Sequence, residues 1–498
     1  MAVKAPDTSR YLEVERKFDV VESTSSPSFG GITAIVRVDG PPAQTLDAVY
    51  FDTPERDLAT KGITLRRRTG GTDAGWHLKL PAGPDARTEV RASLDAAGNG
   101  DGVPADLVDV VLGIVRDRPL RPVARISTTR KVHLLHGADG VLAEFCDDRV
   151  TARLADESAG EQRWREWELE LVGSDAPADI ALLDRLSNRL LGAGATPARH
   201  VSKLARALNG VVPLHDSPPR TANPVHRAVA EQIDELLVWD RAVRADAPDA
   251  VHQMRVTTRK IRSLLRATPD SFGLTDNAWI LDELRELGRV LGTARDAEVL
   301  AERYQQALDS LPPHLVRGRV RERLVDDAQR QYRKGLARSL IALRSQRYFR
   351  LLDALEAVVA EPTARADQPS APVTIEAAYK RVRKASKRAA DASEEDRDDA
   401  LHGVRKKTKR LRYTATATGA GKISERAKAI QTLLGDHQDS VVSRSHLQQQ
   451  AAAAHAAGED TFTYGLLYQQ EAELAQRRRE QLDKALRKLD KAARKTLR

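Results

Sequence analysis

The chain has little of three things that would narrow its class. A single cysteine, Cys146, excludes an internal disulfide and any zinc site built from several cysteines, as is typical of a reducing compartment. No apolar run approaches the roughly 18 residues of a membrane-spanning helix, and the first residues lack the apolar stretch of a signal peptide. Aromatic residues make up only 4% of the chain, which is sparse for a single-stranded nucleic-acid binder. We therefore expect a cytoplasmic protein without a membrane partner, and composition argues modestly against nucleic acid.

Charge is present in quantity and is unevenly distributed. Charged residues make up 30% and hydrophobic residues 41% of 498, a globular composition with room for two or three domains. Residues 1–210 carry 28 Lys and Arg against 31 Asp and Glu, a net −3, so the remainder carries 52 against 40, a net +12. A mixed-sign domain suits a metal with an anion, whereas a basic domain suits a polyanion.

The pattern of secondary structure changes near residue 210. Up to about residue 208 we expect short strands separated by turns, with helical pieces near 104–116 and 178–191, an α+β domain over 8–208. The proline-bearing stretch 211–224 is the expected linker. Residues 225–498 have helical periodicity throughout, with a break at 361–372, and predict an all-α domain.

Charged residues alternate with apolar ones in several predicted strands of the first domain. Glu13, Glu15 and Lys17 fall on one face of a strand, because side chains alternate with period 2. Arg66 and Arg68 alternate in the same way, as do Glu168 and Glu170 further on. One such strand is usually only solvated on its charged face. If these faces converge inside a barrel, the buried charges are too costly unless a charged ligand and metal ions belong there.

The helical region contains a duplicated row of basic residues. The row of His252, Arg255, Arg259 and Arg262 matches, 150 residues later, the row of His402, Arg405, Lys409 and Arg412. Lys260 aligns with Arg410, and Lys380, Arg383 and Lys387 form a third, shorter row. Like charges at these spacings destabilise a helix by about 0.2–0.5 kcal/mol per pair, so the rows need compensation. A solvated face remains an alternative, but a polyanion lying along the rows would supply that compensation.

The duplicated row, with a later Leu-Gly-x-x-x-Asp in each half (Leu291 to Asp296, Leu434 to Asp439), resembles the CHAD domain, the conserved histidine α-helical domain. The resemblance covers about residues 220–498. It implies two related four-helix bundles that bind inorganic polyphosphate. The residues it implies for binding are His252, Arg255, Arg259, Lys260, Arg262, Lys380, Arg383, His402, Arg405, Lys409, Arg410 and Arg412.

Residues 8–208 resemble the CYTH domain of the triphosphate tunnel metalloenzymes. The Glu-x-Glu-x-Lys run is followed in order by Tyr50-Phe-Asp-Thr53, Arg66-x-Arg68, Lys79, Glu89, Arg130, Asp148, Glu168-x-Glu170 and Lys203. The resemblance implies an antiparallel β-barrel whose lumen takes a linear triphosphate with Mg²⁺ or Mn²⁺. The implied metal ligands are Glu13, Glu15, Glu89, Asp148, Glu168 and Glu170. The implied catalytic residues are basic side chains that bind the phosphates: Lys17, Arg66, Arg68, Lys79, Arg130 and Lys203.

These observations predict metal-dependent hydrolysis of a tripolyphosphate-like substrate in the first domain and binding of inorganic polyphosphate by the second. Two alternatives stay open. One is a non-catalytic, polyphosphate-binding protein associated with polyphosphate granules. The other is a class IV-type adenylate cyclase, against which the residues before Glu13 lack a His-Phe pair. The substrate chain length, the preferred metal and the oligomeric state are left open.

Overall fold

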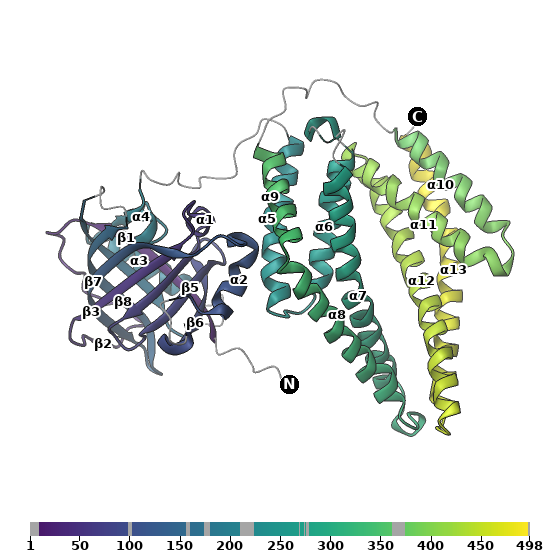
Figure 1. Cartoon of the computed structure of the whole chain (residues 1–498), viewed down its shortest axis with the longest axis horizontal. Coiled ribbons are helices and arrows are strands. Elements are labelled where there is room, and N and C mark those ends of the chain that lie inside the picture. Colours follow the sequence, from purple (N-terminus) through teal and green to yellow (C-terminus); the bar gives the residue numbers. More distant parts are fainter. Residues whose placement is uncertain are drawn as a thin grey trace. The chain divides into compact units, whose positions relative to one another are not determined.

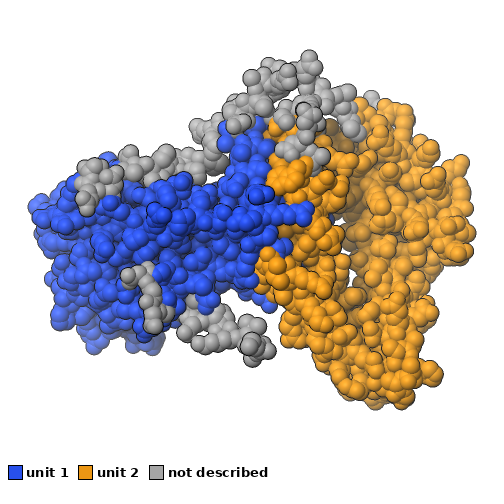
Figure 2. Space-filling view, in the orientation of Figure 1, with its two compact units in different colours: residues 1–261, 342–362 blue, residues 262–341, 363–498 orange. Residues whose placement is uncertain are grey.

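The computed structural model describes residues 9–97, 102–155, 160–173, 180–209, 224–267, 269–272, 274, 278–360 and 374–496 (Figure 1). The expected linker, apart from Pro224, and the expected break at 361–372 lie outside the described residues. The chain divides into two compact units (Figure 2). Unit 1 comprises residues 1–261 and 342–362, and unit 2 comprises residues 262–341 and 363–498.

Eight antiparallel strands close into a barrel in unit 1. In order around it they are β1 (Ser9–Val20), β6 (Ala86–Ala92), β5 (Gly75–Pro81), β4 (Thr64–Thr69), β3 (Gln44–Asp52), β7 (Arg121–His136), β8 (Val141–Leu154) and β9 (Gln162–Leu171). Pairing of β9 with β1 closes the ring. Two short strands extend it, β2 (Arg37–Asp39) beside β7 and β10 (Thr196–Pro197) beside β1. The predicted antiparallel barrel is confirmed.

The apolar side chains of the strands pack outward, against helices. Phe18, Phe145, Trp167 and Leu169 form a buried cluster with leucines of α3 (Ile180–Gly192). A second cluster joins β3, β7 and β8 to the short helix α4 (Lys203–Ala207). The remaining elements of this region are α1 (Asp57–Thr60), α2 (Ala105–Val115) and a 3₁₀ turn at Leu94–Ala97. Because side chains alternate along a strand, this outward packing leaves the charged residues to face the lumen.

The rest of the described chain is helical. Before the break lie α5 (Pro224–Arg244), α6 (Ala250–Ala267), α7 (Ala278–Asp309), α8 (Asp327–Leu343) and α9 (Gln346–Ala360). Between them lie 3₁₀ turns at Pro269–Phe272 and Pro313–Leu315 and a π-helical turn at Glu322–Asp326. After the break lie α10 (Ile375–Ala390), α11 (Glu394–Ala417), α12 (Gly421–Ala456) and α13 (Phe462–Thr496), which share one apolar core. The basic rows fall on α6 and α11, and the later Leu-Gly motifs fall on α7 and α12. Among the described helices, none combines the length and the hydropathy that a membrane span requires.

Candidate functional site

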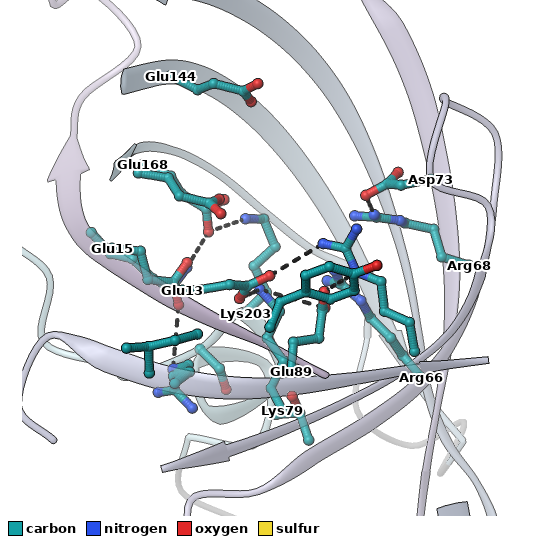
Figure 3. A pocket seen from close by; sticks show the side chains of 18 of the residues that line it. Glu13, Glu15, Arg66, Arg68, Asp73, Lys79, Glu89, Glu144, Glu168 and Lys203 are labelled. Carbon is teal, nitrogen blue, oxygen red and sulfur yellow. Dashed lines mark hydrogen bonds and ion pairs between the residues drawn. The ribbon is translucent and has the colours of Figure 1, made fainter. Parts of the chain in front are cut away.

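The barrel lumen holds a cavity of about 430 Å³ whose lining is mostly charged (Figure 3). Eleven of the twelve predicted barrel residues line it: Glu13, Glu15, Lys17, Arg66, Arg68, Lys79, Glu89, Arg130, Glu168, Glu170 and Lys203. The twelfth, Asp148, is fully buried and does not line the cavity. The structure thus brings together residues that are spread over about 190 positions of sequence, from Glu13 to Lys203.

Carboxylates gather where β8, β9 and β1 run side by side. The strand register places Glu170 opposite both Glu15 and Glu144, and it places Glu168 opposite Lys17. Burial, together with the neighbouring carboxylates, raises the pKa of Glu170 to about 7. Burial also raises the pKa of Glu13. Ionisation of these two buried acids is therefore unfavourable, and a bound cation would make it more favourable.

Guanidinium groups gather on β4 and β7, the two strands that flank β3 in the barrel. Burial and the neighbouring cations Arg66 and Arg130 lower the pKa of Arg68 to about 9. Arg66 donates to the Tyr50 hydroxyl over 3.3 Å, and its Nε atom is buried without a hydrogen-bond partner in the described chain. This crowding is unfavourable at Arg68 and would be relieved by an anion, whereas Arg130 is already paired with Asp148 and Glu168.

Lys203, at the first position of α4, lies among three acids. Its Nζ atom is 2.9 Å from Asp148 Oδ2, 2.8 Å from Glu166 Oε1 and 2.7 Å from Glu168 Oε1. Those three carboxylates approach one another closely enough to hold a metal ion. The Lys203 ammonium group already lies between them, so these three carboxylates bind Lys203 in this structure.

Asp148 is also tied to a second base. Arg130 donates from Nε and Nη2 to the two oxygens of Asp148, over 2.8 and 2.7 Å, and it contacts Glu168 as well. Asp148 is on the lumenal side of β8, whereas its neighbour Asp147 pairs with Arg165 and Ser26. Asp148 is therefore placed to orient Arg130 and Lys203.

Two further lysines bridge the acids. Lys17 Nζ lies 2.8 Å from Glu15 Oε2 and also contacts Glu168, and Lys79 Nζ lies 2.5 Å from Glu13 Oε2. Burial opposes ionisation of Glu15, but the Lys17 ammonium prevails and lowers the pKa of this carboxyl to about 2. Glu15 stays ionised at neutral pH and is available as an oxygen ligand.

Glu89 is fixed in the wall by its neighbours. One of its oxygens lies 2.9 Å from Nδ1 of His77, and the other contacts Arg91. The other ring nitrogen of His77 lies 2.9 Å from the carbonyl oxygen of Asp73. Despite burial, His77 and Lys79 lower the pKa of Glu89.

Several lumenal residues were missed by sequence reasoning. They are Asp73, Arg87, Arg91 and Glu144, which line the cavity, and Glu166, which bonds Lys203. The alternation already used for Glu168 and Glu170 extends back to Glu166, and the alternation at Glu89 extends to Arg87 and Arg91. Those residues could have been found in this way. Asp73 lies between β4 and β5, where no periodicity applies.

The predicted basic residues of the helical region lie in rows that border the buried core. His252, Arg255, Arg259 and Arg262 of α6 are half-buried, as are His402, Arg405, Lys409 and Arg412 of α11, whereas Lys260 and Arg410 are exposed. The Arg405 guanidinium lies beside Gly435 of α12 and near Asp439. Lys380 pairs with Glu376 over 2.6 Å, and Arg383 lines a cavity of about 550 Å³ between α10 and α13.

The comparisons with known proteins agree with this architecture. The CYTH domain model matches residues 12–196, and the CHAD domain model matches residues 227–448. An uncharacterized protein of Mycobacterium tuberculosis strain H37Rv is 67% identical over 99% of both chains. The protein therefore belongs to the family of chains that join a CYTH domain to a CHAD domain. The CYTH match supports membership of the triphosphate tunnel metalloenzymes, whose members are triphosphatases or cyclases.

Two solved structures are similar to parts of the chain. The CHAD domain from the plant Ricinus communis is 26% identical, and the match covers 53% of this chain and 90% of that one with a TM-score of 0.40. PptA from Streptomyces chartreusis is 19% identical, and the match covers 53% of this chain and 98% of that one with a TM-score of 0.43.

Proposed function

We propose that the barrel hydrolyses a tripolyphosphate-like substrate with the help of Mg²⁺ or Mn²⁺. One observation carries this proposal: crowded guanidinium groups and under-neutralised carboxylates face the same cavity. Its lining has eight Lys and Arg (17, 66, 68, 79, 87, 91, 130, 203) against seven Asp and Glu (13, 15, 73, 89, 144, 168, 170), a net +1. A phosphate chain alone would meet too many carboxylates, and a cation alone would meet too many bases. The two together satisfy both sides.

The acids fit the proposed cation. Mg²⁺ and Mn²⁺ prefer oxygen ligands, and the raised pKa values of Glu13 and Glu170 mark buried carboxylates whose ionised form a cation would stabilise. Glu13, Glu15, Glu168 and Glu170 would hold the ion, which when bound supplies Lewis acidity toward phosphate oxygens. The sequence also suggested Glu89 and Asp148 as ligands. Asp148 does not line the cavity, and the two oxygens of Glu89 contact His77 and Arg91, so we assign both carboxylates to positioning neighbouring basic residues.

The bases account for phosphate binding and for the charge that develops during hydrolysis. Water adds to the terminal phosphorus and the bridging P–O bond breaks. The departing diphosphate keeps the bond electrons, and the proton that the water loses passes to the phosphate products or to solvent. Arg66, Arg68 and Arg130 lie where they can stabilise that charge, and Lys17, Lys79 and Lys203 add point charges along the cavity. These positions support the proposed hydrolysis.

Phosphate release from tripolyphosphate by the full chain tests this proposal. We expect release with Mg²⁺ or Mn²⁺, none with EDTA, and loss of activity in Glu13→Ala and Glu15→Ala. Glu161→Ala is the matched control, because Glu161 pairs with Arg153 and Arg163 outside the cavity. Silence of the wild type would favour a non-catalytic polyphosphate binder. Formation of cyclic AMP from ATP would favour a cyclase.

For the helical domain we propose binding of inorganic polyphosphate along the basic rows of α6 and α11. The half-buried Arg and Lys side chains of each row, at i, i+4 and i+7, present charge at short intervals, as a polyphosphate chain does. Association with polyphosphate granules belongs to the same proposal, and the substrate's chain length stays open. Competition of labelled polyphosphate against duplex DNA and RNA tests it. The salt concentration is held fixed, because the affinity for polyphosphate and the affinity for nucleic acid both fall with salt. Equal displacement by DNA would contradict it.

A further inference from the structure

Helix α2 lies between the barrel and two helices of the CHAD domain. It packs on α5, which in turn packs on α9, and all three helices belong to unit 1 (Figure 1). We propose that the outer face of α2 is a docking surface whose partner is the α5–α9 pair of the same chain. The docking joins the barrel and these two helices into one cooperative folding unit. The boundary between the two family domains is then not a boundary between parts that unfold independently.

Arg116, the residue that directly follows α2, makes the contact with α9. Its side chain is only 4% exposed, and its guanidinium pairs with both Asp353 and Glu356 of α9. The backbone at Arg116 has a φ of 59°, in a region that non-glycine residues rarely adopt. Such a conformation persists where surrounding contacts hold it. The two carboxylates of α9 are the contacts that hold this side chain.

Gly113, one turn earlier, makes the close contact with α5. A Cβ atom at this position would lie 2.7 Å from Oδ1 and 3.0 Å from Cγ of Asp240 on α5. Asp240 is fully buried, and Arg244 fixes it by donating from Nε to Oδ1 over 2.7 Å. Moving this carboxylate aside would therefore disturb its two hydrogen bonds with Arg244. Only glycine allows α2 to approach α5 this closely.

Polar pairs continue around these two contacts. Asp109 of α2 accepts from Arg244 of α5 over 3.2 Å and from Arg344 over 2.8 Å. Gln346 of α9 donates to Asp117 over 3.0 Å. The Arg116 and Arg244 side chains are buried, whereas the carboxylates that they reach across the contact are partly exposed. Paired charges of this kind fix the register of an interface through complementarity.

The sign of a glycine substitution tests the proposal. In a helix that faces solvent, glycine to alanine stabilises the helix, because glycine has the more flexible backbone. In the docked helix, Gly113→Ala pushes a methyl group against Asp240. We expect hydrogen exchange of the α2 amides in the full-length protein to become about tenfold faster or more.

The control is Gly288→Ala in α7, where a Cβ meets nothing within 4 Å. We expect that change to slow exchange in α7 or leave it unchanged. Slower exchange of α2 in Gly113→Ala would overturn the docking.

A mutant cycle keeps the proposal testable if Gly113→Ala does not fold. Arg116→Ala, the pair Asp353→Ala with Glu356→Ala, and the triple variant are compared by exchange of the α2 amides. If Arg116 meets these carboxylates in solution, its loss already removes the interaction. We expect the triple variant to exchange within about twofold of Arg116→Ala, since coupled losses do not add. Effects that multiply independently would show that α2 is not docked on α9.

Discussion

Glu170 is the residue at which the electrostatics of the tunnel can be measured most simply. Its pKa is raised to about 7 from an ordinary 4.5, so the folded state binds its proton more tightly than the unfolded state does. A raised carboxyl pKa contributes stability below about pH 4.5, and this contribution is lost as pH rises through 7. Without metal at pH 8, Glu170→Gln should therefore stabilise the barrel, by about 2–3 kcal/mol at most.

Thermal unfolding in EDTA measures this effect. The gain in the midpoint should shrink as pH falls from 8 to 5, and it should vanish or reverse in saturating Mn²⁺, because the variant loses a ligand. Glu161→Gln, at an exposed position on the same barrel, should show neither trend. A Glu170→Gln variant that is less stable than the wild type in EDTA at pH 8 would show that the acid is not under-neutralised.

Cys146 gives a second test at the same scale. Its side chain is buried, and burial raises the thiol pKa to about 12. Only the thiolate reacts with a thiol reagent, and its fraction at pH 8 is on the order of 10⁻⁴. The native protein should leave the reagent unreacted over minutes, and the denatured protein should consume one equivalent. Rapid reaction of the native protein would place Cys146 at a solvent-accessible part of the wall.

Periodicity predicted which residues face the lumen, but not how many of them act there directly. The period-2 pattern around Glu13 was sufficient to place β1, and extending it would have added Glu166, Arg87 and Arg91. It could not show that Asp148 is bonded to Arg130 and Lys203 behind the lining. That distinction depends on the barrel register and on α4, which lie far apart in sequence.

At the scale of elements, mutation can distinguish the basic row of α11 from other lysines on the surface of the same helix. Lys409 belongs to the half-buried row, whereas Lys407 is exposed on the opposite border of the apolar face. Lys409→Gln should weaken polyphosphate binding and reduce its salt dependence by about one ion, as expected for one lost phosphate contact. Lys407→Gln removes the same charge and should change affinity by less than about twofold. Equal losses in titration calorimetry would indicate a diffuse electrostatic attraction instead of a defined row.

Helices were more predictable than the closure of the barrel. The expected helical pieces near 104–116 and 178–191 correspond to α2 and α3, because local apolar spacing is sufficient to mark them. The pairing of residues 14–20 with residues 165–171, which closes the ring, has no local signature. It had to come from family resemblance. The docking of α2 on α5 and α9 also joins segments that are more than 100 residues apart and was not predicted.

At the scale of the whole molecule, the two proposed sites should be separable. Glu15→Gln should abolish phosphate release from tripolyphosphate while leaving polyphosphate binding unchanged, because the basic rows lie on other elements. Lys409→Gln should weaken polyphosphate binding while keeping the rate of tripolyphosphate hydrolysis within about twofold of the wild type. Loss of both functions in either variant, with the fold intact by circular dichroism, would mean that one site serves both ligands.

The central claim is that the lumen becomes electrostatically favourable only when a cation and a phosphate chain fill it together. The most direct measurement is titration calorimetry of a non-hydrolysable tripolyphosphate analogue into the full-length protein, with and without Mn²⁺, using Arg66→Ala to assign binding to the tunnel. The coupling between the two ligands is reciprocal, so we predict at least about tenfold tighter binding of the analogue with Mn²⁺ than with EDTA. The same affinity in EDTA as in Mn²⁺ would contradict the account.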